Sequence, residues 1–142
     1  MQAAKHYMKT VIYVRVSDPG QVEGTSLESQ ENACREYAER KKATIERVFI
    51  EKGESAKFRD RTELLKLIEF CRKRKDIGML IVWKVDRLAR NVGDHLAIKA
   101  EVAKYGTAVC SVTEPIDDSP VGKMTEMILA VFAEFDNCNA PR

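Results

Sequence analysis

A strand near the start of the chain carries three side chains that could do chemistry together. The stretch "VIYVRVS" alternates branched apolar residues with Tyr13, Arg15 and Ser17. Branched residues favour a buried, pleated strand, and alternate side chains of a strand share one face. A phenol, a guanidinium and a hydroxyl are therefore expected to point the same way. A serine hydroxyl is a poor nucleophile unless a neighbouring group activates it or stabilises the charge it develops.

A second charged cluster follows another apolar run. After "MLIVW", the segment "KVDRLAR" supplies Asp86, Arg87 and Arg90. In a helical turn that begins near Asp86, the two arginines are neighbours and repel each other unless an anion lies between them. A phosphate suits this arrangement, because planar guanidinium groups bind its oxygens two at a time and stay charged at any working pH.

Both clusters follow strands that we expect to be neighbours in a parallel sheet, where sites form at the carboxyl ends of strands. Attack by Ser17 on phosphorus would then be helped mainly by charge placed where the transition state becomes more negative. Two alternatives stay open: Arg15 or Arg87 alone is more often a salt-bridge partner, and a serine hydrolase with a histidine base is a competing class. The histidines are His6, near the terminus, and His95, on a predicted helix, and the chain has no G-x-S-x-G elbow.

The order of the elements favours an α/β fold. Four apolar strands are predicted, at 11–17, 44–51, 79–83 and 107–112. Helices are predicted between them, one of them at 62–73 and another ending at Tyr105 before Gly106. This alternation predicts a three-layer α/β/α domain with a mostly parallel central sheet of about four to five strands.

The first predicted helix contains one residue that breaks its pattern. The sequence "TSLE" forms a capping box from Thr25 to Glu28, and Leu27 and Cys34 begin an apolar stripe. Gln30 lies within that stripe, at a position where an apolar residue is expected. It is either a cap for a neighbouring backbone group or a functional side chain.

The last predicted helix is long and has more apolar surface than one stripe needs. It begins at Ser119 and Pro120, and its apolar residues are Met124, Met127, Ile128, Leu129, Val131, Phe132 and Phe135. Either the helix is buried in the core, or one side meets the sheet and the other meets a second subunit.

Composition bounds the remaining possibilities. The 142 residues are 44% hydrophobic and 32% charged, as expected of one soluble globular domain. The net charge of +2 gives no strong pointer to nucleic acid, so any such pointer must come from local clusters of charge. The apolar runs are too short to cross a bilayer, and the N-terminus does not resemble a signal peptide. The four cysteines form no C-x-x-C pair, so we expect reduced thiols, with Cys34 and Cys71 in the core, and a cytoplasmic protein.

Four motifs together resemble the catalytic domain of the serine site-specific recombinases, the family of resolvases, DNA invertases and large serine integrases. They are "YVRVS", "SLESQ", "KVDRLARN" and "SPVGKMTEMILAVFAEF", in the family's order and spacing. The stretch "GTSLESQ" favours the large integrase or transposon branch. The expected organisation is an N-terminal extension at 1–8, a resolvase-type catalytic domain at 9–137 and a tail at 138–142, with the DNA-binding domain that usually follows absent.

The resemblance implies a reaction and a set of residue roles. Ser17 would attack a DNA phosphodiester to leave a 5′ phosphoserine bond and a free 3′ hydroxyl, which can rejoin with no ATP, cofactor or metal. The residues that match the family's phosphate-binding arginines are Arg15, Arg61, Arg87 and Arg90. Gln30 matches a supporting glutamine, and the further matches are Tyr13, Gln21, Ser55 and Asp86, the last as proton carrier or arginine orienter.

The resemblance also implies partners: DNA, a homodimer, a tetramer in the synaptic complex and no membrane, in the cytoplasm and at the nucleoid when DNA is bound. Four positions depart from the family's pattern: Glu51 replaces an aspartate, Ala56 replaces a glycine, and Asp136 and Asn137 replace a Glu-Arg pair. The alternative readings are a catalytically silent dimerisation or regulatory fragment of such a recombinase, and a small phosphoesterase that uses the same arginines.

Overall fold

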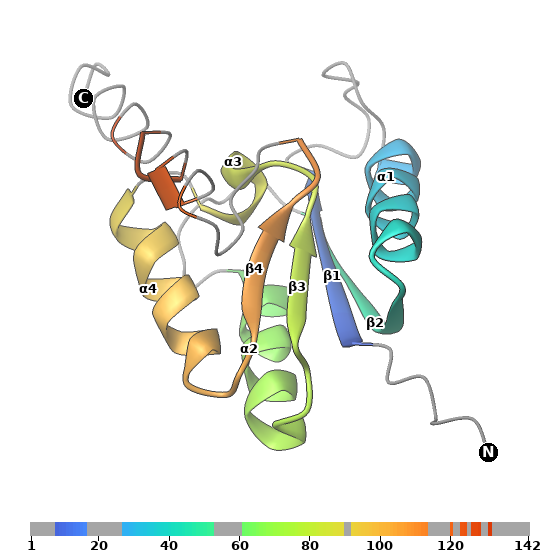
Figure 1. Ribbon diagram of the computed structural model, residues 1–142, viewed down its shortest axis with the longest axis horizontal. Helices are drawn as coiled ribbons and strands as arrows, with labels where there is room; N and C mark the ends of the chain where they lie inside the picture. The colour runs from blue at the N-terminus through green and yellow to red at the C-terminus, as the bar shows by residue number, and fades with distance from the viewer. Residues whose placement is uncertain are drawn as a thin grey trace.

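The computed structural model describes residues 8–16, 27–52, 61–89 and 92–113, together with 120, 123–124, 126–128 and 131. In these residues four strands form one parallel sheet in the order β2-β1-β3-β4 (Figure 1). The strands are β1 (Met8–Val16), β2 (Ala43–Lys52), β3 (Met79–Val82) and β4 (Ala108–Ser111). The predicted parallel α/β sheet is confirmed.

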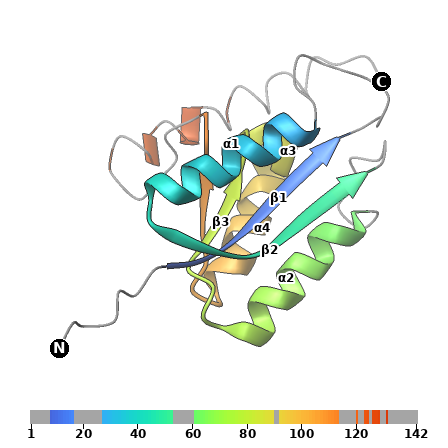
Figure 2. The ribbon, with the colours of Figure 1, turned by 90° about the vertical axis from the view of Figure 1, so that its right-hand side faces the viewer.

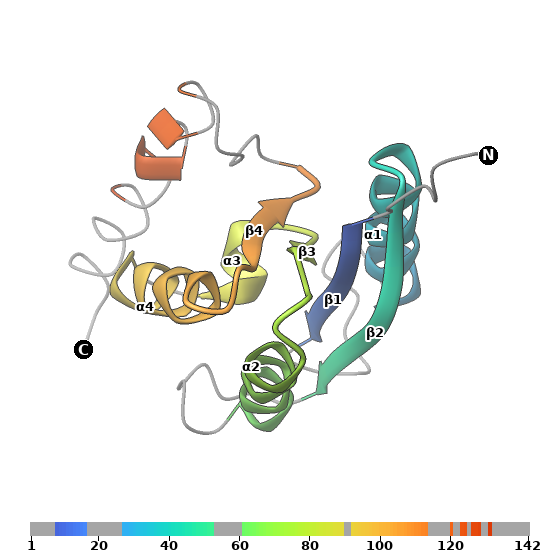
Figure 3. The same ribbon diagram turned by 60° about the horizontal axis from the view of Figure 1, so that its bottom comes forward.

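Helices cover both faces of this sheet. On one face lies α1 (Leu27–Arg40), and on the other lie α2 (Thr62–Arg74) and α4 (Val92–Ala103), as Figures 2 and 3 show. The short α3 (Val85–Leu88) lies at the carboxyl ends of the strands (Figure 1). The three-layer architecture is therefore confirmed. None of the helices in the described ranges is long and apolar enough to span a membrane.

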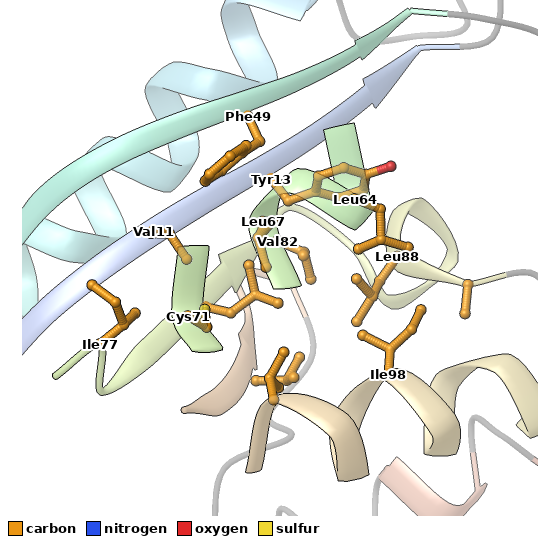
Figure 4. Close-up of a cluster of buried hydrophobic side chains, with 14 residues drawn as sticks. Val11, Tyr13, Phe49, Leu64, Leu67, Cys71, Ile77, Val82, Leu88 and Ile98 are labelled. Atoms are coloured by element: carbon orange, nitrogen blue, oxygen red, sulfur yellow. The ribbon is translucent and has the colours of Figure 1, made fainter. Parts of the chain in front are cut away.

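Strand β1 lies between β2 and β3 and contributes core residues to both faces of the sheet. Val11 and Tyr13 join the cluster under α2 and α4, while Ile12 and Val14 join the cluster under α1, and all four side chains are fully buried. Figure 4 shows the first cluster, in which the Tyr13 ring lies by Leu64 with its oxygen toward the carboxyl end of the strands. Successive side chains of β1 thus point to opposite faces of the sheet, as expected, and both faces bury apolar residues.

The end of α4 shows how the chain returns to the sheet. The helix ends at Ala103, two residues earlier than predicted, because the N–H groups of Gly106 and Thr107 bond back to Ala103 and Val102. Gly106 has φ +87°, a left-handed conformation that glycine adopts at little cost. The turn leads directly into β4.

The described residues between 120 and 131 all have helical backbone, and we refer to them as the C-terminal segment. One continuous long helix over this part of the chain stays a prediction. The thiols of Cys34 and Cys71 are buried and free, as expected from their place in apolar stripes. Burial, with a smaller contribution from Glu31, raises the pKa of Cys34 to about 12, so this thiol is a core residue and not a nucleophile.

Candidate active site

The two sequence clusters meet at the carboxyl edge of the sheet. Strands β1 and β3 are direct neighbours, with Tyr13 paired to Val82, so the chain beyond β3 passes the end of β1. Arg15, which is 5% exposed, donates from Nε to the backbone oxygen of Arg87 over 3.1 Å. The predicted convergence of these segments is therefore present, and it is made by a side chain bonding to a backbone carbonyl.

Arg61 lies between these segments and binds both of them. Its side chain is 2% exposed, and its Nε and Nη2 donate to the Tyr13 hydroxyl over 3.1 and 2.8 Å. Nη2 also donates to the backbone oxygen of Arg87 over 3.1 Å, and Nη1 donates to that of Leu88. One guanidinium at the start of α2 thus fastens β1 to α3.

Glu51, at the end of β2, closes this network from the other side. Its Oε1 accepts the Tyr13 hydroxyl over 3.1 Å and the Leu64 N–H over 3.2 Å, and its Oε2 accepts the Glu63 N–H over 3.3 Å. The residue before α2 makes no side-chain cap, so Glu51 caps this helix from a neighbouring strand. A carboxylate at this position also suits the positive end of the helix dipole.

Sequence reasoning noted Glu51 only as a departure from a family pattern and missed its structural role. The signal was the strand period, because Glu51 follows the buried Phe49 by two residues and so shares its face. An acidic residue on the buried face of a strand needs a partner, and the nearest unsatisfied donors were the first N–H groups of the next helix.

The phenol of Tyr13 is the link between the acid and the arginine. Burial is the main reason that its pKa is raised above its ordinary value, while the neighbouring Arg61 guanidinium acts in the opposite direction. The phenol therefore keeps its proton at neutral pH, so it donates to Glu51 while it accepts from Arg61.

Arg87 combines a fixed backbone with a side chain over an aromatic ring. Its carbonyl accepts hydrogen bonds from Arg15 and Arg61, and its guanidinium carbon lies 5.4 Å from the centre of the Trp83 ring. Lys84 Nζ lies 4.7 Å from the centre of the same ring. Within the described residues Nε of Arg87 has no hydrogen-bond acceptor and the side chain forms no ion pair. The arrangement thus presents cationic groups at the carboxyl edge.

Gln30 is buried in the first turn of α1, as its place in the apolar stripe suggested. It is 1% exposed and shares its row with Cys34 and Ala38. In the part of the chain that the structure describes, its Oε1 has no hydrogen-bond partner. This end of α1 also lies at the carboxyl edge of the sheet (Figure 1).

Several candidate residues lie outside the described residues: Ser17, Gln21, Ser55, Arg90 and the side chain of Asp86. Their roles stay predictions. Their neighbours in the sequence are described, however. Arg15, two residues before Ser17, and Arg87, between Asp86 and Arg90, both lie at the carboxyl edge of the sheet.

A half-open cavity of about 260 Å³ lies at the other end of the sheet. It is lined by Met8, Tyr37, Lys41, Gly78, Met79, Ala108, Val109 and Cys110. These residues belong to the starts of β1, β3 and β4 and to the end of α1, so the cavity is remote from the arginines. The arginine cluster is thus separate from this cavity.

Comparison with known proteins adds independent information. Residues 10–140 match the family model described as resolvase, N terminal domain. The chain is 30% identical over 130 residues to DNA-invertase hin of Salmonella typhimurium, covering 91% of this chain and 61% of that protein. It is 32% identical over 127 residues to the transposon Tn552 DNA-invertase BinR of Staphylococcus aureus, covering 87% of this chain and 59% of the relative. The chain thus spans about three fifths of the length of these relatives.

Solved structures show the same similarity. The N-terminal catalytic domain of TP901-1 integrase superposes with a TM-score of 0.75 at 31% identity, covering 91% of this chain and 96% of that domain. A resolvase family site-specific recombinase from Streptococcus pneumoniae superposes with a TM-score of 0.72 at 29% identity, covering 93% of this chain and 89% of that one.

Proposed function

Because this chain belongs to the resolvase family of serine recombinases, we propose that it cleaves and rejoins DNA through a covalent bond between Ser17 and a 5′ phosphate. The observation that carries the proposal is the meeting of two arginine-bearing segments at the carboxyl edge, where Arg15 and Arg61 both bind the backbone at Arg87. Residues 9–137 form the proposed catalytic domain.

The proposed reaction is a transesterification. The Ser17 oxygen forms a bond to phosphorus and the bond from phosphorus to the 3′ oxygen breaks, so the serine proton leaves and the 3′ oxygen gains one. A 3′ hydroxyl then attacks the phosphoserine and releases the serine. Since one phosphoester bond replaces another at each step, the rejoining needs no ATP, and no metal or other cofactor is part of the proposal.

Arginine charge is the main catalytic device of this proposal. The pentacoordinate transition state carries more negative charge on its oxygens than the diester does, so cations fixed nearby stabilise it selectively. We assign phosphate contacts to Arg15, Arg87 and Arg90, and proton transfer or arginine orientation to Asp86. The supporting residues of the proposed site are Gln21, Gln30 and Ser55.

Arg61 and Tyr13 have a different role in this proposal. The hydrogen bonds of the Arg61 guanidinium go to a phenol and two backbone carbonyls, and the side chain is buried. A direct phosphate contact would require some of those bonds to be exchanged. We therefore assign Arg61 to positioning: it holds the backbone that carries Arg87, and Glu51 and Tyr13 hold Arg61.

The proposed partners are DNA and further copies of the chain, acting in the cytoplasm and at the nucleoid. Two strands of a duplex need two active sites, which a twofold dimer provides, and exchange between two duplexes needs a tetramer. The surface that favours self-association is the apolar face of the C-terminal segment, defined as Met124, Met127, Ile128 and Val131, whose exposed fractions are 59%, 69%, 48% and 61%.

Covalent trapping tests this function. The probe is a pool of short duplexes with a randomised centre and a nick beside it, so that the short piece released by cleavage diffuses away and the adduct accumulates. We expect a DNA-linked species that survives denaturation. Ser17→Ala should abolish it, and the matched control Ser29→Ala, on the exposed side of α1, should retain it.

An adduct that persists in Ser17→Ala would show that another residue is the nucleophile. No adduct from the parent chain over the whole pool would contradict the strand-transfer function and favour the silent module. Turnover of the diester to free products with no covalent species would indicate the phosphoesterase.

A further inference from the structure

The C-terminal segment buries a charged residue and exposes its apolar ones. Glu126 is 6% exposed, whereas every residue of the apolar face is about half exposed or more. In a helix of 3.6 residues per turn, the members of the apolar face lie about 100 to 200° around the axis from Glu126. The segment is therefore turned so that its carboxylate faces the domain and its apolar side faces away.

Two residues of α4 receive this carboxylate. His95 Nε2 lies 2.8 Å from Glu126 Oε2, and Lys99 Nζ donates to Glu126 Oε1. His95 is 2% exposed, and Lys99 follows it by one helical turn, so both point at the same place. Figure 1 shows the red pieces of the C-terminal segment beside the start of α4. The contact joins residues that are far apart in the chain; His95 and Glu126 are buried, and the side chain of Lys99 is partly exposed.

An apolar residue at position 126 would be the ordinary way to pack a helix, since burying a carboxylate is strongly unfavourable without partners. Apolar packing tolerates rotation of a helix about its own axis. A carboxylate that must reach both an imidazole and an ammonium does not, because rotating it away leaves a buried charge unpaired. The polar contact therefore selects one rotation of the segment.

We propose that His95 and Lys99 are positioning residues that hold Glu126 and so turn the apolar face outward toward a second copy of this chain. This inference rests on the self-association suggested under the proposed function. It deepens that proposal, because it names the device that keeps the apolar face available instead of letting it fold back onto the domain.

Charge reversal tests the inference. Glu126→Lys and Lys99→Glu each place like charges in contact, so we expect each to weaken self-association about tenfold or more in a sedimentation concentration series. The double variant reverses the pair and should recover association to within about threefold of the parent. Lys104→Glu, at an exposed residue directly after α4, is the matched control and should leave self-association unchanged.

A second measurement distinguishes loss of the Glu126 contact within one chain from loss of self-association. Amide hydrogen exchange at 126–128 should become faster in Glu126→Lys and return toward the parent rate in the double variant. Met127→Glu should weaken association while leaving the exchange in dilute, monomeric samples as in the parent. If the parent stays monomeric, or if Met127→Glu associates as strongly as the parent, the self-association proposal fails, and the exchange data still decide whether the segment is held by Glu126.

Two outcomes would overturn the inference. One is exchange and association in Glu126→Lys equal to those of the parent. The other is a double variant that stays as impaired as the single ones, because a merely structural loss of packing is not rescued by reversing both charges.

Discussion

Charged residues lie at both ends of the parallel strands, the amino edge and the carboxyl edge, but they are paired differently at the two. At the amino edge, Asp76 pairs with Lys9 at 2.9 Å and with Arg74 at 3.0 Å, and these side chains are 34 to 46% exposed. At the carboxyl edge, Arg61 is 2% exposed and Glu51 is 8% exposed, and a tyrosine hydroxyl stands between them. The exposed charges of the amino edge form ion pairs, whereas the buried Arg61 and Glu51 of the carboxyl edge form hydrogen bonds to neutral groups.

The difference explains why the carboxyl edge suits an anionic ligand. Hydrogen bonds to carbonyls and a phenol fix a guanidinium in place without cancelling its charge. Within the described residues, neither Arg61 nor Arg87 forms an ion pair. The carboxyl edge therefore keeps positive charge that is available to an anion, whereas the ion pairs of the amino edge are already matched.

The largest difference between the two edges is expected on substitution of Arg61. Arg61→Met removes the donors that hold two carbonyls and the Tyr13 hydroxyl, and we expect a loss of about 3 kcal/mol in the free energy of unfolding. Urea titration measures it, with Arg74→Met at the other edge as the matched control, expected within about 0.5 kcal/mol of the parent. Equal losses for the two variants would show that the edges do not differ.

A smaller loss of stability is expected on substitution of Glu51, the carboxylate in the same hydrogen-bond network. Glu51→Gln keeps the shape and one acceptor but removes the negative charge from the start of α2, which should cost about 1 kcal/mol in the free energy of unfolding. The control is Glu46→Gln, whose carboxylate only pairs with the partly exposed Arg74. Indistinguishable unfolding curves for the two variants would mean that the cap at α2 contributes nothing.

The smallest effect belongs to the amino edge and depends on pH. Hydrogen bonds from Arg74 and Lys9 lower the pKa of Asp76 to about 2. Its stabilisation is fully present above the ordinary aspartate pKa of about 4 and is lost as the pH falls through the lowered value. Asp76→Asn should therefore be slightly less stable than the parent at pH 7, and the gap should shrink as acid is added toward pH 2. A gap that widens in acid would contradict the assigned sign.

The sequence predicts the layers and the site's location better than it predicts the site's internal contacts. Alternation in β1 and the apolar run of β3 predict which faces are buried, because the direction of a side chain depends only on its position along the strand. The link from Arg61 to Tyr13 and the backbone at Leu88 depends on how α2 packs, which no local pattern encodes. Glu51 was overlooked for the same reason, since its partners lie on a different element.

The C-terminal segment shows the converse. Its excess of apolar residues was visible in the sequence, and the four of them that the structure describes are all exposed. The orientation was not visible, because it depends on Glu126 meeting His95 and Lys99 of α4. A lone histidine in a sequence gives no sign of such a partner.

The central claim is that Ser17, the residue after β1 in the sequence, carries DNA during the reaction, and peptide mapping tests it most directly. Trypsin releases residues 16–35 as one peptide that contains Ser17, Ser26 and Ser29. After nuclease digestion of the trapped adduct, fragmentation by mass spectrometry locates the nucleotide remnant. The proposal predicts a phosphate-linked remnant on Ser17. A remnant on Ser26, on Ser29 or on any other peptide would contradict it.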